Sequence, residues 1–96
     1  MPEFRKIALE NNRKERRGEL DIIADILSRT SQPLNKTRIM YQANLSFAQL
    51  KVYIKRLKDY GLIEEKNSPI TYRITEKGKK FLTIYSEIME ILYPEQ

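Results

Sequence analysis

Apolar residues recur at helical spacing in four stretches of the chain, and they alternate at strand spacing in one more. The first helical stretch covers residues 19–30, and Pro33 follows it closely. Because a residue that precedes proline avoids helical backbone angles, we expect the helix to end before that point. Its apolar face is expected to carry Leu20, Ile23 and Leu27, widened by Ile22 and Ile26.

A second, shorter helix is predicted over residues 36–42, with Ile39 and Met40 as its apolar contacts. The next three residues form a turn, because Asn44 tolerates the left-handed backbone conformation that a tight turn requires. Leu34, which lies just before this helix, is expected to belong to one short strand.

The third helix, predicted over residues 46–60, has clear start and stop signals. Ser46 is a favourable N-cap, and Gln49, three residues later, can complete a capping box. Gly61 is the expected residue just past the C-terminal end. Four apolar residues recur at spacings of 3, 4 and 3 and predict one buried stripe: Phe47, Leu50, Ile54 and Leu57.

A hairpin follows, made of predicted strands over 62–66 and 70–74 and a turn at Asn67-Ser68-Pro69. Alternate residues of the second strand are apolar and share one side of it: Ile70, Tyr72 and Ile74.

A last helix is predicted over residues 76–92, with Thr75 as its N-cap and Pro94 just beyond its end. Gly78 lies near its start, where glycine lowers helix propensity by about 1 kcal/mol relative to alanine. The chain order is therefore helix, short strand, helix, turn, helix, strand, turn, strand, helix. Three helices followed by a hairpin, or wing, predict a winged helix-turn-helix, an α+β fold that is mostly α.

Composition narrows the class of protein. The 96 residues suffice for one compact domain, and 41% of them are hydrophobic. Cysteine and histidine are absent, which removes disulfides, Cys-based metal sites and the usual general base. The sequence offers no paired carboxylates in a plausible cleft, no nucleophile with a base and no Gly-rich phosphate loop, so we expect no catalytic residues, cofactor or metal.

Hydropathy bears on location. No apolar run approaches the roughly 18 residues of a membrane span, and the first residues lack the apolar core of a signal peptide. We therefore expect a cytoplasmic protein, associated with the nucleoid if it binds DNA, with no membrane partner and no small-molecule substrate.

The net charge of +5 is unevenly distributed. No acidic residue occurs between Asp25 and Asp59, whereas every charged residue after Lys80 is acidic. Such a basic middle would attract a polyanion. The basic residues of the acid-free stretch are Arg29, Lys36, Arg38, Lys51, Lys55, Arg56 and Lys58.

The third helix is predicted to be a DNA recognition helix, because one side anchors it while the other is polar and basic. In the major groove, glutamine can pair with adenine and arginine with guanine. The expected base-edge contacts are Ser46, Gln49, Val52 and Tyr53 in its N-terminal part. The expected phosphate contacts are Lys51, Lys55, Arg56 and Lys58.

Two flanking segments supply further candidate DNA contacts. Lys36, Thr37 and Arg38 open the second helix, whose free N–H groups suit a phosphate. Wing residues that can reach DNA are Lys66, Asn67, Ser68 and Arg73. Glu64 and Glu65, which precede the wing turn, would repel DNA and are expected to point away from it.

The last helix carries more apolar residues than one face of a monomer needs. Phe81, Tyr85, Ile88 and Leu92 fit a seam of spacing 4, 3 and 4, with further apolar residues beside it. The surplus predicts a homodimer that places two recognition helices on one duplex. The expected dimer contacts are Phe81, Ile84, Tyr85, Ile88, Ile91 and Leu92.

Three separated motifs carry a resemblance: KTRIMYQANLS at 36–46, YGLI at 60–63 and ITEKGKKFL at 74–82. Together they resemble a family of small archaeal winged-helix DNA-binding proteins, which includes chromatin proteins and predicted transcription regulators. The resemblance implies cofactor-free DNA binding and a C-terminal helix that pairs antiparallel in a dimer. The organisation expected is a basic arm or marginal helix over 1–17, a DNA-binding winged helix-turn-helix over 18–75 and a dimerisation helix over 76–93.

Two functions remain open at this stage. The first is a DNA-binding transcription regulator or chromatin protein with helix 46–60 in the major groove. The second is a winged-helix adaptor that binds other proteins and no DNA. The acid-free stretch favours the first.

Overall fold

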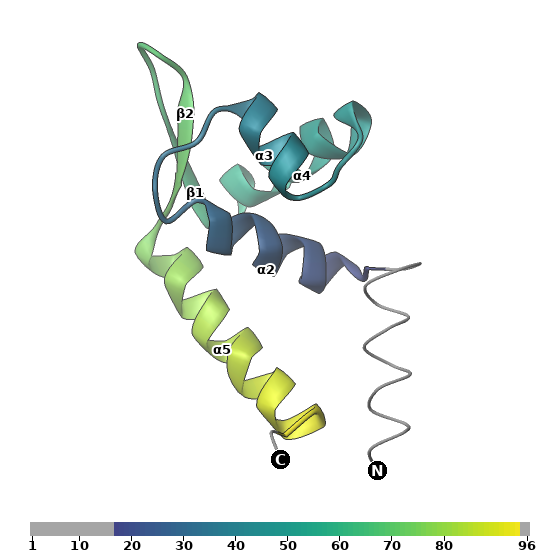
Figure 1. The fold of residues 1–96 in the computed structure, drawn as a ribbon. Coiled ribbons are helices and arrows are strands. Elements are labelled where there is room, and N and C mark those ends of the chain that lie inside the picture. The colour runs from purple at the N-terminus through teal and green to yellow at the C-terminus, as the bar shows by residue number, and fades with distance from the viewer. Residues whose placement is uncertain (1–16, 95–96) are drawn as a thin grey trace.

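The computed structural model describes residues 17–94, which contain four α-helices and a two-stranded antiparallel sheet (Figure 1). The predicted arm lies outside the described residues, apart from Arg17. Within residues 17–94, no helix is both long and apolar enough to cross a membrane. The elements are α2 (Glu19–Arg29), α3 (Lys36–Gln42), α4 (Phe47–Asp59), β1 (Ile63–Lys66), β2 (Thr71–Ile74) and α5 (Glu76–Leu92).

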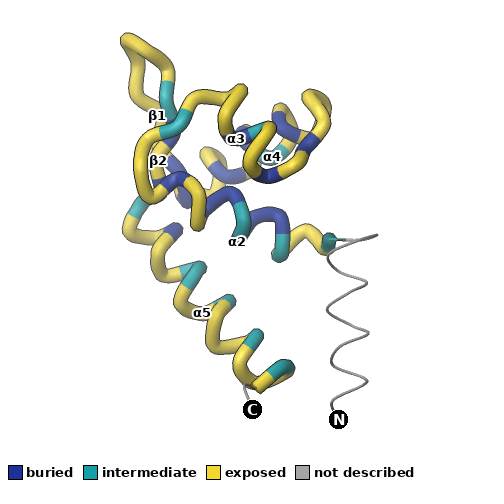
Figure 2. The backbone as a smooth tube through the Cα atoms, in the orientation of Figure 1, coloured by how far each residue is buried: buried dark blue, intermediate teal, exposed yellow. Residues whose placement is uncertain are grey.

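This architecture confirms the predicted winged helix-turn-helix. Asn44 in the turn before α4 and Gly61 after it both have positive φ angles, as expected. The buried residues gather where α2, α4 and the base of the hairpin meet, whereas α5 is exposed along most of its length (Figure 2). The largest fully buried side chains are Ile26, Leu27, Thr30, Ile39, Leu50 and Leu57.

Two predicted core residues lie outside the core. Leu20 is 56% exposed, because it lies in the first turn of α2, at the end of that helix away from the hairpin (Figure 1). Phe47 is 63% exposed, so the buried stripe of α4 contains three residues rather than four. In the turn that precedes α4, Ala43 and Leu45 are the residues buried in the core.

The hairpin pairs Ile63 with Ile74 at its base and continues antiparallel toward the turn. Leu34, expected in a short strand, forms a single bridge to Tyr72 through two backbone hydrogen bonds of 3.0 and 2.8 Å. Tyr72 and Ile74 are buried as the alternation predicts. Ile70 precedes β2 in the wing turn and is half exposed, so its predicted place in the strand is wrong.

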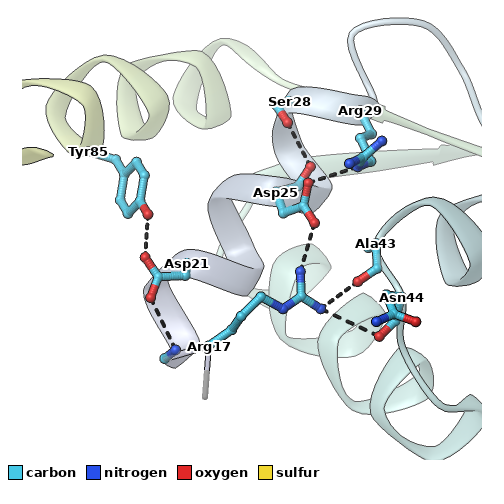
Figure 3. Close-up of polar contacts among 9 residues, drawn as sticks. Arg17, Asp21, Asp25, Ser28, Arg29, Ala43, Asn44 and Tyr85 are labelled. Carbon is cyan, nitrogen blue, oxygen red and sulfur yellow. Dashed lines mark hydrogen bonds and ion pairs between the residues drawn. The ribbon is translucent and has the colours of Figure 1, made fainter. Parts of the chain in front are cut away.

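Arg17 belongs to the folded domain rather than to the arm. Its guanidinium group donates to the Asp25 carboxylate at 2.8 Å and to the backbone carbonyl oxygens of Ala43 and Asn44 (Figure 3). Those two carbonyls lie in the turn between α3 and α4. Arg17 therefore ties the start of the domain to the residues that orient α4.

The start of α5 packs directly on the segment that leaves α4. The Thr75 hydroxyl accepts the Gly78 N–H at 3.0 Å and donates to the Gly61 carbonyl oxygen at 2.6 Å. Gly78 is buried, and a Cβ atom there would lie 2.4 Å from the Leu62 carbonyl oxygen and 2.6 Å from Ile74 Cγ1. A glycine that helix propensity disfavours is therefore required by a backbone contact.

Replacing Gly78 by alanine tests this contact. In an exposed helix the change would stabilise by up to about 1 kcal/mol. Here we expect a net destabilisation of about 1–3 kcal/mol, because a carbonyl oxygen and a side chain must move. Chemical denaturation measures the change, and Lys80→Ala on the exposed side of α5 is the control. A Gly78→Ala protein as stable as the wild type would contradict the contact.

Candidate nucleic-acid interface

The exposed side of α4 begins at a reciprocal cap. The Ser46 hydroxyl accepts the Gln49 N–H at 3.1 Å, and the Gln49 side-chain oxygen accepts the Ser46 N–H at 2.9 Å. The predicted capping box is confirmed, and it already uses one lone pair of the oxygen with which Gln49 would accept from adenine.

One flank of α4 faces the hairpin across a cleft. Lysines at three helically spaced positions of α4, together with Lys36 from α3, bring four ammonium groups to this cleft. Within residues 17–94, Lys36 and Lys51 form no ion pair. The cleft is lined by Lys36, Lys51, Ile54, Lys55, Lys58, Asp59, Glu65, Ile70 and Tyr72.

The other flank of α4 is held toward α2. Tyr53 is half-buried against the core, and the Arg56 guanidinium group lies 5.9 Å from the centre of its ring. Arg56 also pairs with Glu19 of α2 at 2.9 Å. This pair is about half exposed, so it contributes at most about 1 kcal/mol and does not prevent Arg56 from meeting a phosphate.

Glu65 contradicts the expectation that both wing glutamates point away from the basic surface. Directly opposed residues of an antiparallel pair share a face, and Glu65 is opposite the buried Tyr72. Its carboxylate therefore enters the lysine cleft and accepts a 2.6 Å hydrogen bond from Lys58. That bond lowers the pKa of Glu65 and raises the pKa of Lys58.

The predicted wing contacts lie apart from the cleft. Side chains alternate along a strand, so Lys66 and Arg73 occupy the hairpin face opposite to that of Glu65 and Tyr72. Arg73 is directly opposite Glu64 there. The structure thus separates these two basic residues from the four cleft lysines.

The start of α3 is capped by Asn35, the residue just before the helix. The Asn35 carboxamide oxygen accepts the Arg38 N–H at 2.9 Å. Lys36, Thr37 and Arg38 are all exposed, and Lys36 alone among them lines the cleft.

The sequence analysis did not predict that two aromatic residues on α3 and α4 would be exposed. Tyr41 on α3 is 75% exposed, and Phe47 lies under the Lys51 ammonium group, 5.5 Å from its ring centre. The helical spacing of Phe47 suggested burial, and nothing local to the sequence distinguishes it from a core residue.

Comparisons with known proteins agree with this geometry. A family model described as winged helix-turn-helix matches residues 16–92. The chain belongs to this winged helix-turn-helix family. The resemblance to archaeal winged-helix DNA-binding proteins is thereby confirmed, and the relatives named below come from two archaea.

A solved structure is similar to this winged helix-turn-helix protein throughout most of its length. It is the crystal structure of Sso10a-2, a DNA-binding protein from Sulfolobus solfataricus, with a TM-score of 0.71 and 32% identity. The match covers 78% of this chain and 81% of that one.

Two uncharacterized proteins of Methanocaldococcus jannaschii are similar in sequence over 82 residues, or 84% of this chain. MJ0287 is 34% identical, and 82% of its length is matched. MJ0290 is 33% identical, and the chain spans only 38% of its length.

The six expected dimer contacts on α5 fall into two groups that differ in burial: two face the rest of this winged helix-turn-helix protein and four are exposed. Phe81 packs against the core and stacks on Tyr85, whose hydroxyl donates to Asp21 of α2 (Figure 3). Burial, followed by this hydrogen bond, raises the pKa of Tyr85. The other four are exposed, by 47% at Ile84, 40% at Ile88, 77% at Ile91 and 57% at Leu92.

The Glu65–Lys58 hydrogen bond predicts how the stability of this winged helix-turn-helix protein depends on pH. The pKa of Glu65 is lowered from its ordinary 4.5, so the bond stabilises the fold above that pH and is lost as the pH falls through the lowered value. We expect Lys58→Met to return the pKa of Glu65 toward 4.5 in an NMR titration of its carboxyl carbon. Lys55→Met, which removes a lysine bonded to Asp59 instead, should leave it in place. Equal shifts in the two variants would refute the assignment.

Proposed function

We propose that this protein binds double-stranded DNA by placing the N-terminal half of α4 in the major groove. The observation that carries the proposal is the arrangement of α4, which is anchored through Leu50, Ile54 and Leu57 and flanked by four lysines. The similarity to a DNA-binding protein of known structure supports it. A binding role rather than an enzymatic one fits both the family and this neighbour.

Phosphates are the proposed partners of the cleft lysines. Lys36 and Lys51 come from two elements, line the same cleft and form no salt bridge within residues 17–94. Lys55 pairs with Asp59 on the same helix, but its side chain is 77% exposed. Exposed pairs of this kind contribute at most about 1 kcal/mol, so a phosphate can replace the carboxylate.

The other expected contacts also belong to the proposal. Thr37 and Arg38 can reach phosphate beside Lys36, and Arg56 can do so from the opposite flank of α4. Ser46, Gln49, Val52 and Tyr53 stay candidate base-edge contacts. Lys66 and Arg73 would contact DNA only if the duplex extends to the outer face of the wing.

Charge removal in the cleft tests DNA binding. We expect the double variant Lys51→Ala/Lys55→Ala to bind a mixed-sequence duplex more weakly. Two lost phosphate contacts should also reduce the slope of log affinity against log salt by about 1.8. Fluorescence anisotropy at several salt concentrations measures both quantities.

The control carries the same change in charge elsewhere. Lys79→Ala/Lys80→Ala alters the first turns of α5, outside the cleft, and should change the slope much less. If the cleft variant binds DNA as the wild type does, the adaptor function becomes the better explanation.

The finer part of the proposal is a homodimer formed through α5. Ile84, Ile88 and Ile91 are exposed and follow one another at spacings of 4 and 3, which is the spacing of a helix–helix seam. This seam replaces the one expected through Tyr85, because Tyr85 turns toward α2. The first turns of α5 carry Lys77, Lys79 and Lys80, and its second half carries Glu87 and Glu90. An antiparallel pair would bring opposite charges together, whereas a parallel pair would align like charges.

Glutamate in the exposed seam should abolish this dimer. We expect the wild type to sediment with the mass of two chains and Ile84→Glu/Ile88→Glu with the mass of one, because the seam would bury unpaired carboxylates. Thr83→Glu adds a charge to the same helix outside the seam and should remain dimeric. A wild type that sediments as a monomer would end this part of the proposal without affecting DNA binding.

The proposed role in the cell is that of a transcription regulator or a chromatin protein. The two differ in the ratio of specific to nonspecific affinity, which is large for a regulator and small for a protein that coats DNA. Competition by random duplexes for complexes on a candidate promoter measures this ratio.

A further inference from the structure

The first two turns of α4 present an apolar surface where a polar one was expected. Phe47 is 63% exposed and Val52 is 46% exposed, and Ala48 between them is exposed too. Ala48 and Val52 are four residues apart, as are Phe47 and Lys51, so each pair lies on adjoining turns of the same side. Helical spacing places Phe47 on one side of Lys51 and places Ala48 and Val52 on the other side. The three apolar residues therefore flank the lysines, and we call them the apolar strip.

Polar side chains near the strip are already engaged. The Ser46 hydroxyl and the Gln49 side-chain oxygen accept each other's backbone N–H groups. Lys51, whose ammonium group lies over the Phe47 ring, and Lys55 are the proposed phosphate contacts rather than base-edge contacts. Few side-chain donors and acceptors at this end of α4 are therefore free to bond the donors and acceptors on base edges.

Base edges in the major groove offer one exposed apolar group. Guanine, cytosine and adenine present only acceptors or donors there, whereas thymine also presents its C5-methyl group. We infer that Phe47, Ala48 and Val52 contact thymine methyl groups and thereby give the protein a preference for thymine at the positions under α4. This inference rests on the proposed DNA binding and adds a specificity to it.

Covering a methyl group releases water but no counterion. Burial of one such group is worth about fourfold in affinity. The preference should therefore persist at high salt, while the total affinity, which depends on phosphate contacts, falls steeply. The salt dependence therefore distinguishes the thymine preference, which the apolar strip would give, from the total affinity, which the lysines would give.

Uracil provides the matched probe, because it differs from thymine only by lacking the methyl group. We expect the wild type to bind a mixed-sequence duplex about fourfold more weakly, for each methyl group covered, when uracil replaces every thymine. Phe47→Ala and Val52→Ala should each reduce this ratio, and the double variant should bring it close to one. Both side chains are exposed, so the variants should fold.

Tyr60→Ala is the control, since Tyr60 is an exposed aromatic residue at the opposite end of α4, about 20 Å away along the helix axis. It should keep the wild-type ratio. Equal affinity for both duplexes, or a ratio that the strip variants leave unchanged, would overturn the inference while leaving DNA binding intact. A Phe47→Ala variant that changes the sedimentation mass would assign the ring to a protein contact and overturn it as well. Failure to bind either duplex would instead refute the proposed function.

Discussion

Three side chains, Leu50, Ile54 and Leu57, hold α4 against the rest of the protein. Full burial of a side chain of this size contributes about 1.5–3 kcal/mol, whereas an exposed ion pair contributes at most about 1 kcal/mol. The position of α4 therefore depends on its apolar stripe and not on its salt bridges. Because the stripe occupies one side, the charged residues on the other sides can exchange partners without moving the helix.

The acidic residues of α2 extend this anchoring to the neighbouring elements. Glu19 pairs with Arg56 of α4. Asp21 accepts from Tyr85 of α5, and Asp25 accepts from Arg17, as Figure 3 shows. Two of these acids lie in the first turn of α2, where the helix dipole also favours them. The same residues thus suit the local helix and also contact the elements on either side of it.

The cleft between α4 and the wing contains both lysines and carboxylates. Glu65 pairs with Lys58 across the cleft, while Lys36 and Lys51 form no salt bridge within residues 17–94. Lys36 and Lys51 are therefore the cleft lysines that a phosphate can meet without displacing a carboxylate, whereas Lys55 and Lys58 must first exchange one.

Sequence patterns predicted the order of elements, because caps, turns and periodicity act within a few residues. The capping box at Ser46, the left-handed Asn44 and the N-cap Thr75 were all visible in that way. The cationic side of α4 was visible for the same reason, since helical spacing alone separates it from the buried stripe.

Which surfaces meet was decided only by the tertiary structure. Leu20 and Phe47 have core-like spacing but lie where no other described element covers them. Glu65 faces the lysines because the register of the hairpin sets it opposite Tyr72, and Gly78 is required because Leu62 approaches from another part of the chain. Burial and charge pairing depend on neighbours distant in sequence, which periodicity along a single chain does not encode.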